Sequence, residues 1–139
     1  MGTAVRSRIA RAFAQARSEG RPALIAFVIP GYPDEEGAAE AFDAMAAGGA
    51  DVIEVEVPFS DPLADGATIQ GAVFESLARG TTPADCLDFV EAARSRHPDM
   101  PVVVMTYLNP VLAMGLEGFA ARAAAAGADG VILVDLPAE

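Results

Sequence analysis

Residues 49–66 read GADVIEVEVPFSDPLADG, and this stretch decides the fold. The apolar run over 52–57 is typical of a buried strand, and it leads into an acidic loop that contains two prolines. Within the strand, Glu54 and Glu56 are carboxylic acids. An ionised carboxylate is costly to remove from water unless a charge pairs with it or a proton neutralises it. Two of them on one face of a strand therefore indicate a candidate site.

The Gly-Ala-Asp tripeptide at 49–51 recurs at 127–129, before a second apolar run. Each run is followed by an acid and, two residues later, by a proline. Helix signals separate the apolar runs, among them Asp34 and Thr82 as N-caps and Gly127 as a C-terminal stop. Alternating strands and helices predict an α/β fold with a parallel sheet and right-handed crossovers.

We expect one domain over residues 1–139. The expected strands are 23–29, 51–57, 102–107 and 130–135, and the expected helices are 35–47, 68–79, 83–96 and 116–126. A further helix is expected over 1–19, because Gly20 and Pro22 stop it before the first strand. Residues 1–18 contain four Arg and no acid, which also resembles an organellar transit peptide. We favour a helix that covers one end of the domain, in a cytoplasmic protein.

The composition excludes several classes of function. Hydrophobic residues make up 53% of the chain, which is enough for a core, and the apolar runs are too short to span a membrane. A formal net charge of -11 repels phosphate backbones and anionic surfaces, so we expect neither nucleic acid nor a membrane as a partner.

The reactive side chains are few. All nine basic residues are Arg, so the chain lacks the lysine of a Walker A loop or a Schiff base. The single cysteine, Cys86, forms no internal disulfide and no cysteine-based metal site. The single histidine, His97, follows a helix pattern and is interpreted as a solvated helix-end residue. Carboxylates remain the best candidates for catalysis.

Strand alternation places Val52, Glu54 and Glu56 on one face of the second strand and its apolar residues on the other. If the apolar face meets the helices, both glutamates point into the interior of a barrel. The neighbouring strands add further side chains to that interior, namely Phe27, Ile29, Met105, Tyr107, Ile132 and Val134. This arrangement predicts an apolar pocket with carboxylates and one phenol, suited to an aromatic substrate and proton transfer.

The sequence resembles the α subunit family of tryptophan synthase. Its most specific match is 58–66, PFSDPLADG, followed by Ile69 and Gln70. Further matches are 26–27, 31–34, 80–83, 105–107, 109–110 and 124–137, so the resemblance covers the chain from about residue 6. The family has a TIM (βα)8 barrel fold. The resemblance therefore implies the first four βα units of such a barrel, with an N-terminal helix and an extra helix after the second strand.

The family cleaves indole-3-glycerol phosphate to indole and glyceraldehyde 3-phosphate, a retro-aldol reaction without metal or organic cofactor. By resemblance, Glu54 matches the glutamate that moves protons at the indole carbon and the glycerol hydroxyl, and Asp65 matches the aspartate that interacts with the indole N–H. The expected pocket residues are Phe27, Met105, Tyr107, Ile132 and Val134. For the four apolar ones, simple barrel core is an equal interpretation.

The resemblance also implies a partner, the β subunit of tryptophan synthase. The loop residues Pro58, Phe59, Ser60 and Asp61 match the segment that faces it. The alternative is that these residues only shape the turn. Asp135 is interpreted as a strand-end residue bonded to the backbone rather than as a functional group.

Two departures from the family pattern matter. Glu56 stands where the family has glycine, so we expect a second carboxylate in the pocket, about 7 Å along the strand from Glu54, and altered or weakened catalysis. The second departure is length, since a complete barrel takes about 250 residues and binds phosphate with loops after its later strands.

Three interpretations therefore stay open. The chain is the carboxylate-bearing half of a lyase, incomplete on its own; or a non-catalytic relative that binds a β-type subunit; or a half-barrel that pairs with a second copy and acts on a different substrate.

Overall fold

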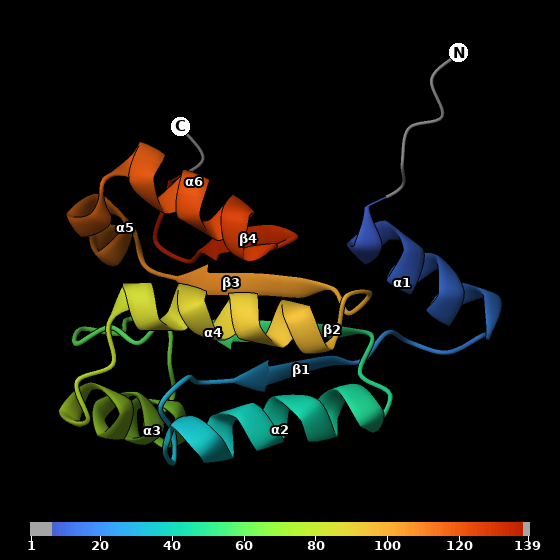
Figure 1. The fold of residues 1–139 in the computed structure, drawn as a ribbon, viewed down its shortest axis with the longest axis horizontal. Helices are drawn as coiled ribbons and strands as arrows, with labels where there is room; N and C mark the ends of the chain where they lie inside the picture. Colours follow the sequence, from blue (N-terminus) through green and yellow to red (C-terminus); the bar gives the residue numbers. More distant parts are fainter. Residues whose placement is uncertain (1–6, 138–139) are drawn as a thin grey trace.

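The computed structural model describes residues 7–137. Four parallel strands form one sheet, and their order in space, β1-β2-β3-β4, is their order in the sequence. Helices connect them, as Figure 1 shows. The strands are β1 (Ile25–Val28), β2 (Val52–Glu56), β3 (Val102–Thr106) and β4 (Gly130–Leu133), and the helices are α1 (Arg8–Ser18), α2 (Glu35–Ala47), α3 (Ala67–Ala78), α4 (Pro83–Arg96), α5 (Leu108–Met114) and α6 (Leu116–Ala126).

One face of the sheet packs against helices to form the core. Ile53, Val55 and Val57 are fully buried on this face, in a cluster with Phe42 of α2 and Leu87 of α4. Figure 1 shows both helices lying along the sheet. The prediction that the apolar face of β2 meets the helices is confirmed, so Glu54 and Glu56 lie on the opposite, inner face.

Most predicted elements are present, with one omission. Strands 23–29, 51–57, 102–107 and 130–135 are found with shorter bounds, and two helices, α3 and α4, separate β2 from β3 as expected. The sequence did not predict α5. Pro110 is its third residue, where proline is tolerated because the N–H groups of a first helical turn have no partner within the helix.

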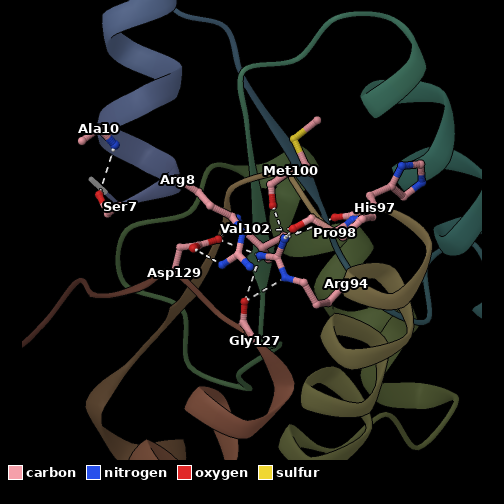
Figure 2. Close-up of polar contacts among 10 residues, drawn as sticks. All are labelled: Ser7, Arg8, Ala10, Arg94, His97, Pro98, Met100, Val102, Gly127 and Asp129. Carbon is pink, nitrogen blue, oxygen red and sulfur yellow. Dashed lines mark hydrogen bonds and ion pairs between the residues drawn. The ribbon is translucent and has the colours of Figure 1, made fainter. Parts of the chain in front are cut away.

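A largely buried ion pair fixes the end of the sheet where the strands begin. Figure 2 shows Arg94 and Asp129 at its centre. The Arg94 guanidinium donates to Asp129 Oδ2 at 2.7 Å and to the backbone carbonyls of Met100 and Gly127. Asp129 also accepts from Arg8 of α1 at 2.9 Å and from the backbone N–H of Val102 at 2.9 Å. The cluster thus ties α1, α4, β3 and β4 together.

The repeated Gly-Ala-Asp has one structural role in both copies. Asp51 accepts a hydrogen bond from the backbone N–H of Leu24 just before β1, as Asp129 does from Val102 at the start of β3. Each aspartate thereby joins the start of its own strand to the preceding strand. Hydrogen bonds from Arg21 and from Leu24 hold the pKa of Asp51 at about 2.

Over residues 7–137, no helix is both long and apolar enough to cross a membrane.

Candidate active site

The strand register brings the predicted side chains to one inner face. Phe27, Glu54 and Val103 are paired across three strands, and the row ends at Gly130. Residues paired in a parallel sheet point to the same side. The next row towards the carboxyl ends consists of Glu56, Met105 and Ile132. The face predicted from alternation is therefore the face that the structure has.

Glu54 lies half-buried in the row that it forms with Phe27 and Val103. Burial raises its pKa above the usual value of a glutamate. Among the described residues, its carboxylate makes no hydrogen bond or ion pair with another side chain. A carboxyl group with a raised pKa and free oxygens is suited to accept and return protons.

Glu56 is the deeper of the two acids. Its side chain is 0% exposed, and neither carboxylate oxygen has a hydrogen-bond donor among the described residues. Burial, followed by the negative charges of Asp65 and Glu54, raises the pKa of Glu56 to about 8. At neutral pH, therefore, Glu56 carries a proton.

Tyr107 anchors the loop that follows β2. Its hydroxyl donates to Asp65 Oδ2 at 3.1 Å and accepts from the backbone N–H of Ala64 at 2.9 Å. Its ring lies 5.4 Å from that of Phe59 between centroids. Burial, first among several causes, raises the pKa of the Tyr107 hydroxyl. The loop is thus folded back over the carboxyl end of β2.

Asp65 therefore lies beside Tyr107, at the carboxyl end of β2. Gln70 of α3 donates from Nε2 to the Asp65 carbonyl at 2.7 Å, which fixes the backbone here. The negative charge of Asp65 acts on Glu56, whereas the sequence pairs Asp65 with Glu54.

The other predicted pocket residues differ in exposure. Met105 and Tyr107 are buried and Phe27 is half-buried, whereas Ile132 and Val134 are exposed. Ile132 lies on the edge strand β4, and Val134 follows that strand rather than belonging to it. Within residues 7–137, no further strand covers this side.

The predicted partner loop lies beside α5. Pro58, Phe59 and Ser60 line an open groove of about 560 Å³ together with residues of α3, α4 and α5. Asp61 lines a neighbouring hollow, and its carboxylate accepts from the Ser60 hydroxyl at 2.7 Å. Leu63 in the same loop is 86% exposed.

The remaining reactive groups have structural partners. Asp135 accepts from the backbone N–H of Leu108 at 2.7 Å, which confirms its interpretation as a strand-end residue. His97 ends α4, with Nε2 2.7 Å from Asp43 Oδ1. Cys86 is buried, which raises the pKa of its thiol. Among residues 7–137, no three His, Cys, Asp or Glu side chains are grouped to hold a metal ion.

Sequence reasoning missed two kinds of site residue. Val103 lies in the row of Glu54, and alternation along its own strand was the signal that could have identified it. Gln70 was noted only as part of a motif. The hydrogen bond from the Gln70 side chain to the Asp65 carbonyl joins residues five positions apart across the start of α3. Neither helix nor strand periodicity predicts such a contact.

Comparisons with known proteins agree on one family. The family model described as tryptophan synthase alpha chain matches residues 13–139. The curated tryptophan synthase alpha chain of Rhizorhabdus wittichii is 52% identical over 133 residues, which are 96% of this chain and 49% of that protein.

Solved structures agree. A protein from Aquifex aeolicus superposes with a TM-score of 0.91 at 39% identity, over 95% of this chain and 52% of that one. Tryptophan synthase subunit alpha from Legionella pneumophila superposes with a TM-score of 0.89 at 37% identity, over 94% and 50%. The chain thus spans about half the length of the relatives it matches, and its four strands are the first half of a TIM barrel. These matches establish that the chain belongs to the tryptophan synthase alpha chain family.

Proposed function

We propose that this chain is the carboxylate-bearing half of a lyase that cleaves indole-3-glycerol phosphate into indole and glyceraldehyde 3-phosphate, in tryptophan biosynthesis. The observation that carries the proposal is the pair of inward-facing acids on β2, beside Asp65 and Tyr107, in a chain of this family. A cytoplasmic location is proposed on the family's biosynthetic role alone.

Glu54 is the proposed acid and base. As the bond between the indole ring and the glycerol chain breaks, the glycerol hydroxyl gives up its proton and becomes the aldehyde, while the indole carbon gains a proton. A carboxyl group whose pKa is raised by burial serves for both transfers. Asp65 accepts the indole N–H, which stabilises the tautomer that cleaves. Phe27, Met105, Tyr107, Ile132 and Val134 are the proposed lining of the indole pocket.

The phosphate of this substrate needs residues beyond this half. In TIM barrels, phosphate sites frequently lie on the loops after the seventh and eighth strands. Residues 7–137 contain four strands. Turnover is therefore proposed for the complete barrel.

A tryptophan synthase β subunit is the proposed partner, bound by the loop with Pro58, Phe59, Ser60 and Asp61. The groove between this loop and α5, and the exposed Leu63 beside it, support this assignment. Addition of a β subunit is expected to change indole release, and Leu63→Asp is expected to weaken that effect.

The test is a chimera that joins this chain to the second half of the Rhizorhabdus wittichii relative, with indole release as the measurement. We expect release, and a loss of about 100-fold or more in Glu54→Gln, since general acid–base groups contribute that much. Glu36→Gln, on the exposed surface of α2, is the matched control. Activity that survives Glu54→Gln contradicts the proposed role of Glu54.

The second candidate is a non-catalytic relative that binds a β-type subunit. The buried Glu56 favours it, because a carboxyl group there fills space in the pocket. A folded chimera that releases no indole but still alters β-subunit activity supports this candidate. Glu56→Gly is expected to increase indole release, and no gain contradicts the steric argument.

A further inference from the structure

The loop of residues 58–66, which carries Asp65, is held by few side chains from elsewhere in the chain. Among residues 7–137, two side chains outside the loop make hydrogen bonds to it, those of Tyr107 and Gln70. Both of them bind Asp65 itself, and Tyr107 also binds the neighbouring Ala64. The contacts that fix this loop are therefore concentrated on one residue and its neighbour.

Tyr107 holds the side chain of Asp65. The N–H of Ala64 can only donate, so the tyrosine oxygen accepts from it, at 2.9 Å. The hydroxyl proton is then left for Asp65 Oδ2, at 3.1 Å. The tyrosine is 1% exposed, and its ring packs against Phe59 with 5.4 Å between the ring centroids. A buried ring whose hydroxyl both donates and accepts fixes where this carboxylate lies.

Gln70 holds the backbone of the same residue. Its Nε2 donates to the Asp65 carbonyl at 2.7 Å, from within α3. The N-cap of this helix is Gly66, which has no side chain to cap it. Its φ of -76° and the open space around its Cβ position would allow a side chain there. Since no cap joins the loop to the helix, this tie depends on Gln70.

These contacts leave one oxygen of the Asp65 carboxylate uncommitted. Oδ2 is bound to Tyr107, whereas Oδ1 accepts no hydrogen bond from residues 7–137. We propose that Tyr107 and Gln70 are positioning residues that clamp Asp65 and keep this second oxygen available for the indole N–H. The inference rests on the proposed function, in which Asp65 accepts that N–H. Tyr107 then contributes its ring to the pocket and its hydroxyl to the clamp.

Loss of the clamp should lower kcat more than it changes KM. Positive charge develops on the ring nitrogen as the indole carbon gains a proton, so an oriented carboxylate stabilises the transition state more than the bound substrate. Tyr107→Phe is expected to lower kcat about 10-fold, because a hydrogen bond to a charged group contributes about that factor. Gln70→Met removes a neutral hydrogen bond and is expected to cost about fivefold.

The chain offers matched controls in its other tyrosine and its other glutamine. Tyr32 is 39% exposed, and its hydroxyl makes no hydrogen bond within residues 7–137. Gln15 lies on the exposed surface of α1. Tyr32→Phe and Gln15→Met therefore remove the same atoms at positions outside the proposed site, and kcat is expected to stay unchanged in both.

Amide hydrogen exchange tests the clamp without any enzymatic activity. Exchange of residues 58–66 is measured by mass spectrometry on the 139-residue chain. We expect about 10-fold faster exchange in Tyr107→Phe, because the loop loses both hydrogen bonds of the hydroxyl, and a smaller rise in Gln70→Met. The two control variants should match the wild type. Unchanged exchange in Tyr107→Phe overturns the clamp.

A double-mutant cycle in the chimera shows whether Tyr107 acts through Asp65. Once Asp65→Ala has removed the carboxylate, Tyr107→Phe is expected to lower kcat for indole release by about twofold or less, in place of about 10-fold. Equal losses in the two backgrounds overturn the positioning role, because Tyr107 would then act on the fold alone. A chimera that releases no indole, while loop exchange rises in Tyr107→Phe and not in Tyr32→Phe, contradicts the lyase proposal and supports the clamp on Asp65.

Discussion

At the residue scale, Glu56 couples folding to pH. Its pKa is about 8 in the folded chain and 4.5 as an ordinary glutamate. Between these values the folded state keeps a proton that the unfolded state releases. The stability that Glu56 contributes is thus complete below pH 4.5 and decreases as the pH rises towards 8.

The expected change is about 2 kcal/mol between pH 6 and pH 8, because a single proton is worth about 1.4 kcal/mol per pH unit. Glu56→Gln cannot ionise, so its free energy of unfolding should gain about that amount over the wild type across this interval. Urea unfolding of both chains at the two pH values measures it. An equal pH dependence in the two chains contradicts the raised pKa.

At the element scale, the cluster around Asp129 fixes the ends of two strands and two helices. Its side chain is 7% exposed and accepts from Arg94, Arg8 and the Val102 N–H. Removal of one member of a buried ion pair costs about 3–5 kcal/mol, since the other charge stays buried without its partner. Asp129→Ala should lower the free energy of unfolding by that amount.

The matched control is Asp43→Ala. Asp43 also pairs with an arginine, Arg96, at 3.0 Å, and with His97, but its side chain is 43% exposed. Solvated ion pairs contribute less than about 1 kcal/mol. Urea unfolding distinguishes the two variants, and equal losses would contradict the assignment of Asp129 as the structural centre of this end of the sheet.

The helices show why part of the fold could be predicted from the sequence. Helices 35–47, 83–96 and 116–126 have the predicted bounds, because local signals set them: Asp34 accepts from the Gly37 N–H, Thr82 forms a capping box, and Gly127 adopts a left-handed conformation. Strand bounds were predicted too long, since pairing with a neighbour decides where a strand ends. The seven-residue α5 is too short for a periodic signal.

The site was predictable in part for the same reason. Alternation along β2 predicted that Glu54 and Glu56 share the inner face, because the period of a strand is local. The contact of Asp65 with Tyr107 depends on how a nine-residue loop folds back, which no local pattern encodes. The roles of Glu54 and Asp65 in catalysis, and the extent of the chain as one domain, stay predictions. The expected helix over 1–19 is found from Arg8 to Ser18, and residues 1–6 lie outside the described part.

At the scale of the whole molecule, the described sheet has two open edges. In residues 7–137, β1 and β4 each pair on one side only. Apolar side chains lie exposed at both edges, Ile25 at 50% and Val131 at 43%. Unpaired strand edges with exposed apolar residues favour association with another chain. Four parallel strands are half of an eight-stranded barrel, so two copies could close one.

We therefore expect the 139-residue chain, expressed alone, to self-associate, with sedimentation velocity showing species heavier than its 14.3 kDa. In the chimera, the second half of the Rhizorhabdus wittichii relative should cover both open edges, so the chimera should sediment as one barrel. Ile25→Asp should reduce self-association, because it places a charge on the open edge. Ala121→Asp, on the exposed surface of α6, should not. A stable monomer of the isolated chain contradicts this expectation and argues against a half-barrel homodimer.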